Sequence, residues 1–253
     1  FSSTESGNIS YGGSCSSSTT SARADNNTIT FNALAEGTYD NCTISVTDNT
    51  SNTSDNLSVS SFTIDKTAPT LDNVTIASNN SDNTTLAKTG NVITLSITSA
   101  EAIQTPSVSI AGQAATVTGS GTSWSAAYTM VEARDEGSVS LNIGFSDLAG
   151  NAGIAVDNTT NGSAVRFDSI APTLDNVTAF TTPSADNRTS YTFSSDEEGT
   201  ITYGGSCSSS TTSATADNNT IIFDALADGT YDNCTITVTD NASNTSDNLS
   251  VSS

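Results

Sequence analysis

The cysteines are the side chains whose chemistry follows most directly from their spacing. They form two pairs, Cys15 with Cys42 and Cys207 with Cys234, and each pair is separated by 27 residues. Metal and redox sites usually use Cys-x-x-Cys pairs or nearby histidine, and the sequence contains no histidine. We therefore expect two intradomain disulfides, each stabilising a small domain by about 3 kcal/mol through loop closure, and a location outside the cytosol.

The residue types present in the sequence also argue against catalysis. Without histidine, neither a Ser-His-Asp nor a Cys-His arrangement can form. Paired carboxylates can cleave glycosides, but the acidic clusters recur at the spacing of an internal repeat, and a catalytic site is rarely copied into every repeat. Gly204-Gly205 is short and flanked by serine, which is more typical of a turn than of a phosphate-binding loop. We expect a protein that is not an enzyme.

The recurring residues belong to a long repeat. Residues 193–253 repeat residues 1–61 at an offset of 192, and only ten of the 61 positions differ. A cysteine-free stretch separates the two copies, so the chain has the order A-B-A. We predict a type A domain over 1–65 that lacks its first strand, a type B domain over 66–167, and a second type A domain over 168–253 whose last strand is clipped.

Composition and periodicity indicate the fold class. The formal net charge is −21 with six basic residues, which disfavours binding to nucleic acid or to anionic membrane surfaces. No apolar run approaches the roughly 20 residues that span a bilayer, so we expect no membrane insertion in this segment. Short period-2 runs such as Thr220–Phe223, Val92–Ile97 and Trp124–Tyr128 alternate with Gly, Asn, Asp and Ser clusters. This pattern predicts an all-β chain of antiparallel two-sheet sandwiches.

Two kinds of motif resemble a known family. Asp228-Gly229-Thr230-Tyr231, followed by alternating residues to Val238-Thr-Asp240-Asn-Ala-Ser-Asn244, is similar to the end of bacterial immunoglobulin-like domains. Ser146-Asp147-Leu-Ala-Gly-Asn151 has the same loop in purer form. The joints Asp65-Lys-Thr-Ala-Pro69 and Asp168-Ser-Ile-Ala-Pro172 resemble the Asp-x-x-Ala-Pro linkers of these arrays. The resemblance implies tandem immunoglobulin-like β-sandwiches, although Ser243 replaces the usual glycine and paired cysteines are not general in the family.

The resemblance also implies a function. Such domains are repeated modules of large secreted adhesins and biofilm proteins on Gram-negative bacterial surfaces, where they hold a tip domain away from the cell. We expect a structural spacer at the cell surface whose partners are neighbouring copies of the repeat and other chains in a fibre. Two alternatives stay open: a carbohydrate-binding module for surface glycans, and a binder of ice or mineral surfaces through the alternating Thr235, Thr237 and Thr239.

Some of these arrays use Ca²⁺ to stiffen their joints, and the sandwich topology brings acidic residues to the same end of each domain. The predicted metal ligands are Asp65, Glu101 and Asp147 for type B, and Asp168, Glu197 and Asp240 for the second type A domain. Crowded carboxylates favour a hard, oxygen-preferring cation. The alternative is turn chemistry, because Asp and Asn hydrogen-bond their own backbone. No EF-hand loop is present in the sequence.

Overall fold

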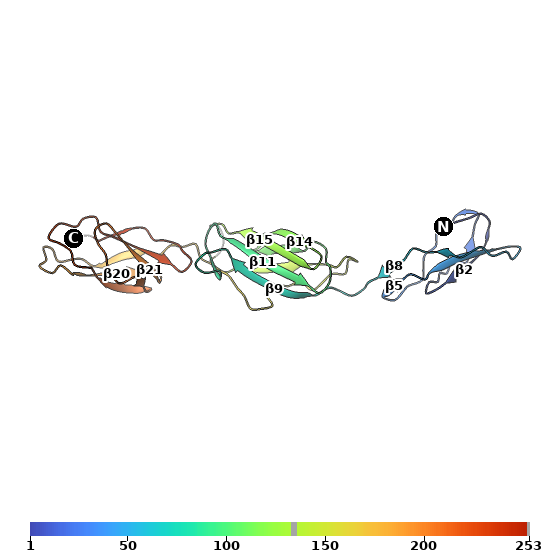
Figure 1. The fold of residues 1–253 in the computed structure, drawn as a ribbon, viewed down its shortest axis with the longest axis horizontal. Coiled ribbons are helices and arrows are strands. Elements are labelled where there is room, and N and C mark those ends of the chain that lie inside the picture. Colours follow the sequence, from blue (N-terminus) through green and yellow to red (C-terminus); the bar gives the residue numbers. More distant parts are fainter. Residues whose placement is uncertain (133–135, 252–253) are drawn as a thin grey trace. The chain divides into compact units, whose positions relative to one another are not determined.

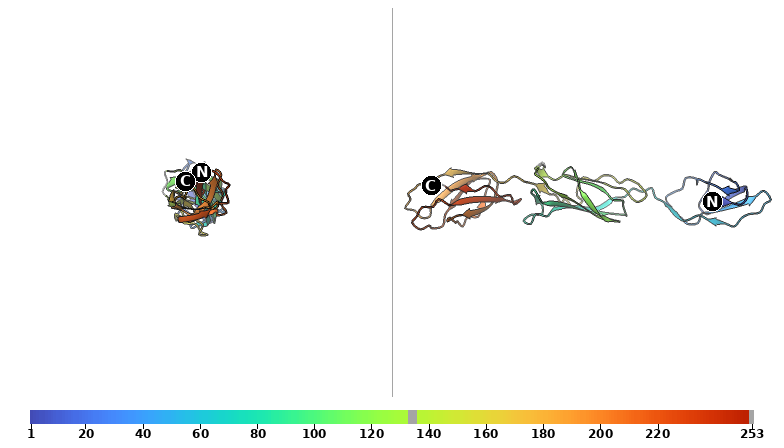
Figure 2. Two further views of the ribbon diagram at one scale, coloured as in Figure 1. Left: turned by 90° about the vertical axis from the view of Figure 1, so that its left-hand side faces the viewer. Right: turned by 90° about the horizontal axis from the view of Figure 1, so that it is seen from above.

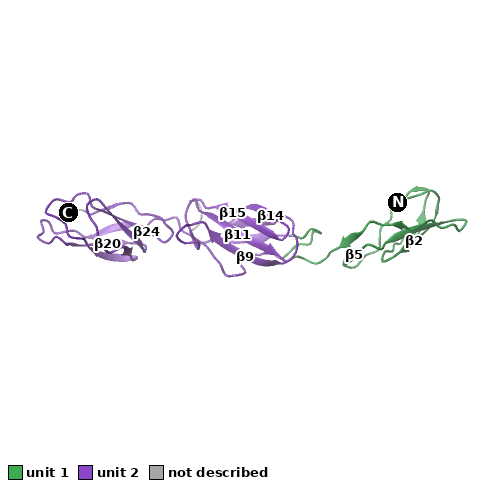
Figure 3. Ribbon diagram, in the orientation of Figure 1, with its two compact units in different colours: residues 1–69, 146–153 green, residues 70–145, 154–253 purple. Residues whose placement is uncertain are grey.

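The computed structural model describes residues 1–132 and 136–251, and within these ranges it contains strands and no helix. The predicted all-β class is therefore confirmed (Figure 1). The chain divides into two compact units (Figure 3). Unit 1 comprises Phe1–Pro69 with Ser146–Gly153, and unit 2 comprises Thr70–Phe145 with Ile154–Ser253.

Unit 1 is built from eight short strands in three antiparallel sheets. Its main sheet has the order β3-β2-β6-β7, and the smaller pairs are β1-β4 and β5-β8. The bounds are β1 Ser2–Ser3, β2 Gly7–Gly12, β3 Ser21–Ala22, β4 Asp25–Asn26, β5 Gly37–Tyr39, β6 Thr43–Asp48, β7 Leu57–Ser58 and β8 Phe62–Ile64. Its core cluster is small: Ile9, Ala22 and Ile44 are buried, and partly buried side chains such as Tyr11 and Val46 pack against them.

The first part of unit 2 is a sandwich of one four-stranded sheet and two three-stranded sheets. The orders are β14-β15-β11-β9, β13-β12-β17 and β10-β18-β16, in which β10 and β18 pair parallel. The bounds are β9 Leu71–Ser78, β10 Leu86–Ala87, β11 Val92–Ser99, β12 Ser107–Ile110, β13 Gln113–Ala114, β14 Thr116–Ser120, β15 Ser123–Thr129, β16 Gly137–Ser138, β17 Leu141–Gly144 and β18 Arg166–Phe167. Figure 2 shows the ribbon of the chain in two further views.

Alternation along these strands produces the core of this sandwich. Ile93, Leu95 and Ile97 of β11 are fully or almost fully buried, while the threonine and serine between them point away from the core. Ile143 of β17 belongs to the same cluster from the other layer. Trp124 packs against the cluster and is half-buried, and its ring nitrogen donates to the Gly121 carbonyl at 3.1 Å.

The second part of unit 2 is the second copy of repeat A. Its sheets have the orders β19-β20-β23 and β22-β21-β24-β25. The bounds are β19 Leu174–Thr178, β20 Ser190–Ser195, β21 Gly199–Gly204, β22 Ser213–Ala214, β23 Asp217–Ile222, β24 Thr235–Asp240 and β25 Leu249–Ser250. Tyr191 and Phe193 of β20 are fully buried in a cluster larger than that of unit 1.

Both predicted disulfides are present in the structure. Cys15 is bonded to Cys42 with a Cα separation of 5.3 Å, and Cys207 to Cys234 with 5.4 Å. In each copy the half-cystine follows a turn at Gly13 or Gly205, where φ is positive and an added Cβ would collide with the carbonyl of Asn41 or Asn233. Gly204 thus ends β21 and Gly205 begins the turn that the sequence indicates.

The core residues form three separate clusters that fall within 1–65, 66–167 and 168–253. The boundary predicted near Asp168 lies inside unit 2, where both sandwiches belong to one compact unit. Among the described residues, the structure has no helix that is both long and apolar enough to cross a membrane.

Candidate functional site

Three loops with the spacing Asp-x-x-x-Asn lie at the ends of β6, β17 and β24. In each loop one oxygen of the aspartate accepts the backbone N–H of the asparagine, and the other oxygen accepts its side-chain amide. The distances are 2.8 Å for both bonds between Asn52 and Asp48, 2.7–2.8 Å between Asn151 and Asp147, and 2.8–2.9 Å between Asn244 and Asp240. The turn chemistry considered for these aspartates is therefore real. Asp48 also accepts the Thr50 backbone N–H, Asp147 the Gly150 N–H, and Asp240 the Ala242 N–H.

The environments of Asp48 and Asp147 both lower the pKa of the carboxyl group. Hydrogen bonds from the Asn52 side chain and backbone lower the pKa of Asp48 to about 2. Burial raises the pKa of Asp147, but the hydrogen bonds from Asn151 and Gly150 outweigh it and hold the pKa below its ordinary value. Both side chains are therefore carboxylates at neutral pH.

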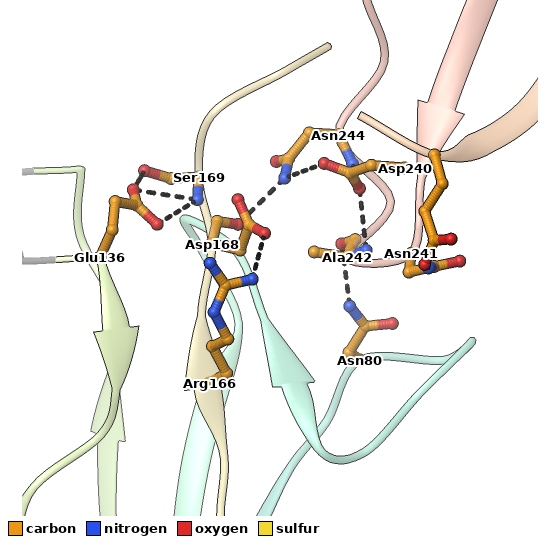
Figure 4. A network of polar contacts seen from close by, with 10 residues as sticks. Asn80, Glu136, Arg166, Asp168, Ser169, Asp240, Asn241, Ala242 and Asn244 are labelled. Atoms are coloured by element: carbon orange, nitrogen blue, oxygen red, sulfur yellow. Dashed lines mark hydrogen bonds and ion pairs between the residues drawn. The ribbon is translucent and has the colours of Figure 1, made fainter. Parts of the chain in front are cut away.

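The asparagine of two of these loops also ties the loop to the linker aspartate. Asn244 Nδ2 donates to the backbone carbonyl of Asp168 at 3.0 Å in unit 2, as Figure 4 shows. Asn151 Nδ2 donates to the backbone carbonyl of Asp65 at 3.2 Å in unit 1. The joint thus brings the linker aspartate and the loop aspartate to the same place by one repeated arrangement.

Glu197 completes an acidic cluster with Asp168 and Asp240 in unit 2. Burial, followed by repulsion from Asp168, Asp240 and Asp196, raises the pKa of Glu197 to about 7. Burial and the charge of Asp240 also raise the pKa of Asp168, against the opposing effect of Arg166 at 3.1 Å. Glu197 Oε2 is buried and, among the described residues, has no hydrogen-bond partner. The cluster therefore holds negative charge that neighbouring side chains neutralise poorly.

A second set of contacts at this joint does not involve Asp168, Glu197 or the Asp240 side chain. Asn80 is 4% exposed, and its Nδ2 donates to the backbone carbonyl of Ala242 at 3.0 Å. Lys88 Nζ donates to the carbonyl of Ser243, and Ser243 Oγ donates to Asp82 Oδ2 at 2.5 Å. These bonds join the loop before β10 and the residue after it to the 240–244 loop, and so fasten one sandwich of unit 2 to the other (Figure 4).

The linker itself is held on its other side by Glu136. Both oxygens of Glu136 accept the Ser169 backbone N–H at 3.1 Å, and Oε1 also accepts the Ser169 hydroxyl at 2.6 Å. Ser169 directly follows Asp168, so Glu136 fixes the position of the linker aspartate (Figure 4). The charge of Glu136 contributes to the raised pKa of Asp168.

The predicted ligands of the first joint are only in part within one unit. Asp65 and Asp147 both belong to unit 1, and they offer carboxylate oxygens within 4.8 Å of one another. Asp147 is almost fully buried and Asp65 is half-buried. Glu101 belongs to unit 2, where it follows β11 and its carbonyl accepts the Ser99 hydroxyl at 2.5 Å. Its role as a ligand stays a prediction.

Sequence reasoning found the aspartates and Glu197 but missed the groups that position them. Asn151 and Asn244 stand in the quoted motifs, and their spacing of four residues from the aspartate was the available signal. Asn80, Lys88 and Glu136 carry no local signal, because their partners are distant in the sequence.

The comparisons with known proteins do not assign the chain to a family. No protein-family model matches the sequence, and no curated protein matches it significantly. The two disulfides and the all-β fold are compatible with an extracellular structural protein.

Proposed function

We propose that this chain is a structural spacer of an extracellular bacterial adhesin or surface fibre, built from tandem immunoglobulin-like sandwiches. The A-B-A repeat, the disulfides and the hydrogen-bonded joint in unit 2 support a mechanical role. The resemblance of the Asp-x-Ala-Gly-Asn loops and Asp-x-x-Ala-Pro linkers to bacterial immunoglobulin-like arrays supports the same conclusion. A part whose function is to provide length benefits from near-identical copies and from joints that resist bending. We do not expect it to catalyse a reaction.

We further propose that Ca²⁺ binds at the joint formed by Asp168, Glu197 and Asp240. The observation that carries this proposal is the buried Oε2 of Glu197, a group whose pKa is raised by burial and by the charges of Asp168 and Asp240. Burial and like charges make ionisation of this carboxyl group costly, and a bound cation removes that cost. Ca²⁺ prefers carboxylate and carbonyl oxygens, and extracellular modules bind it with dissociation constants of about 10⁻⁴ to 10⁻³ M. Bound there, it would supply a positive charge shared by linker, loop and strand end. Asp65, Asp147 and Glu101 are proposed as the corresponding ligands of the first joint.

The experiment is a titration of the protein with Ca²⁺, in which isothermal calorimetry measures binding. Small-angle X-ray scattering of the same samples, in calcium and in chelator at matched ionic strength, measures flexibility. The test variant is Glu197→Gln, and the matched control is Glu5→Gln, the equivalent position in the first copy of the repeat. We expect the native chain and the control to bind Ca²⁺ and to become less flexible, and the test variant to lose one binding event. Equal binding by the native chain and Glu197→Gln, or no calcium effect on the native chain, would reject the calcium joint.

A second candidate function is binding of an ordered surface such as ice or a mineral. One observation favours it: in the main sheet of the second copy, Thr200 lies opposite Thr239 and Thr202 opposite Thr237, on the solvent face. The first copy has Asn8, Ser10 and Ser45 at three of these four positions. Inhibition of ice recrystallisation by the native chain, lost in a variant with Thr200→Asn, Thr202→Ser and Thr237→Ser, would support this function; no inhibition would reject it for ice.

A further inference from the structure

The 240–244 loop of repeat A and the 147–151 loop of the type B stretch are closed by the same hydrogen bonds but differ in sequence at two positions. Asn241-Ala-Ser243 stands in the first loop where Leu148-Ala-Gly150 stands in the second. At the last of these three positions the backbone is left-handed in both loops, with φ of +73° at Ser243 and +99° at Gly150. The two loops thus present the same backbone with a different side chain.

Serine is an unfavourable residue at this left-handed position. Glycine adopts a positive φ without steric cost, whereas a residue with a Cβ costs free energy there. Both copies of repeat A nevertheless have serine, since Ser51, the counterpart of Ser243, has φ of +69°. A backbone outlier of this kind indicates that the side chain has a role.

In unit 2 the side chain of Ser243 has a partner in the preceding sandwich. Its Oγ donates to Asp82 Oδ2 at 2.5 Å, and a hydroxyl bond to a charged acceptor is stronger than one between neutral groups. Asn80 and Lys88, by contrast, donate to main-chain carbonyls of the 240–244 loop. Any loop of this backbone shape offers those carbonyls. Of these three residues, only Asp82 therefore contacts a side chain that differs between the loops.

The other differing position bonds within its own sandwich. Asn241 Nδ2 donates to Glu198 Oε1 at 2.9 Å. Its counterpart in the 147–151 loop, Leu148, is 71% exposed. Discrimination between the two loops at this joint therefore depends on Ser243 against Gly150.

We propose that Asn80, Asp82 and Lys88 form a recognition surface at the end of the type B sandwich, and that its partner is the loop of a type A domain with serine at the left-handed position. Asn80 and Lys88 hold the loop through its carbonyls, and Asp82 selects the serine hydroxyl. A loop with glycine there, as in type B, lacks the donor for Asp82. The joint thereby favours a type A domain after a type B domain, which deepens the proposed spacer function and rests on it only for its purpose.

The test compares Ser243→Gly with the matched control Ser51→Gly in the whole chain, with chelator present, by NMR measurement of amide protection factors. Ser51 has the same left-handed backbone, and its hydroxyl has no hydrogen-bond partner in the described part of unit 1. Glycine removes the backbone strain from both loops. We expect protection of Thr50–Asn52 to stay equal or rise, and protection of Ala242–Asn244 to fall about threefold to tenfold, because the bond to Asp82 is lost.

A double-mutant cycle assigns this fall to the pair of side chains. Asp82→Ala removes the acceptor, and Asp72→Ala removes an equal charge near the start of β9. We expect Ser243→Gly to have little further effect in the Asp82→Ala background and its full effect in the Asp72→Ala background. Unchanged protection of Ile236 shows that the sandwich stays folded.

Two results would overturn the proposal: equal changes in the loops of Ser51→Gly and Ser243→Gly, or a full effect of Ser243→Gly without Asp82. Because the measurement is made in chelator, it can fail while the calcium titration succeeds, and the reverse. Selection by Asp82 and the calcium joint of the proposed function are therefore tested separately.

Discussion

Asn80 Nδ2 donates a hydrogen bond of 3.0 Å to the backbone carbonyl of Ala242, 162 residues away in the sequence. Asn80 is buried, and its Oδ1 accepts the N–H groups of Asp82 and Asn83 in its own turn. One side chain thus shapes a turn in one sandwich and fastens it to a loop of the next. The joint of unit 2 has this neutral anchor in addition to its acidic cluster.

The first prediction concerns this anchor. Asn80→Ala leaves the Ala242 carbonyl without its partner, which should cost about 1–3 kcal/mol and increase hydrogen exchange at Ala242–Asn244. The control is Asn83→Ala, which lies in the same turn but whose side-chain oxygen accepts the backbone N–H and hydroxyl of Thr85. If Asn80→Ala and Asn83→Ala change exchange in the 240–244 loop equally, Asn80 is not the anchor of the joint.

A second prediction concerns pH. The folded-state pKa of Glu197 is raised to about 7 from an ordinary value of 4.5. The folded state therefore binds this proton more tightly than the unfolded state, and the associated stability is complete below about pH 4.5 and is lost as pH rises through 7. In chelator, the melting temperature of unit 2 should fall between pH 5 and pH 8. Glu197→Gln should flatten this dependence, and a native profile that rises over the same interval would contradict it.

A third prediction concerns calcium and stability. If the joint binds Ca²⁺ with a dissociation constant of about 10⁻⁴ M, 10 mM Ca²⁺ should stabilise unit 2 by about 2.7 kcal/mol. Bound calcium should also remove the pH dependence caused by Glu197, because the cation competes with the proton. Thermal unfolding followed by Trp124 fluorescence measures this, since Trp124 is the only tryptophan and lies in unit 2. Mg²⁺ at the same concentration serves as the control.

The disulfides should contribute unequally to the integrity of the two copies. Closing a loop over 27 residues stabilises by about 3–4 kcal/mol in the chain-entropy description. The first copy has a core cluster of three buried residues, whereas the second buries eleven. Replacing Cys15 and Cys42 by alanine should therefore unfold the first copy, and replacing Cys207 and Cys234 should only destabilise the second. Amide exchange at Ile44 and Ile236 distinguishes the two results.

The two copies of the repeat carry equivalent phenylalanines that differ in burial, so the contribution of this core position to stability can be compared. Phe193 is fully buried, whereas its counterpart Phe1 is half-buried. Phe193→Ala should cost about 3–5 kcal/mol in the unfolding free energy, and Phe1→Ala clearly less. Denaturant unfolding of the two variants measures the difference, and equal losses would mean that the first copy buries its phenylalanine in solution.

Local features of this protein were determined by the sequence alone. Period-2 alternation predicted strands such as β11 and β15, because a strand buries every second side chain. Equal spacing in two copies predicted the pairs Cys15–Cys42 and Cys207–Cys234, and the Asp-x-x-x-Asn spacing marked the loops at Asp147 and Asp240. Each of these depends on neighbours in the chain or on repetition, which a sequence displays directly.

Only the tertiary structure decided which distant groups meet. The parallel pairing of β10 with β18, the anchor from Asn80 to Ala242 and the contact of Glu136 with Ser169 join segments that share no local pattern. The raised pKa of Glu197 has the same origin, because burial and the charges of Asp168 and Asp240 act through space. Desolvation and repulsion depend on distance and on excluded water, and the fold sets both.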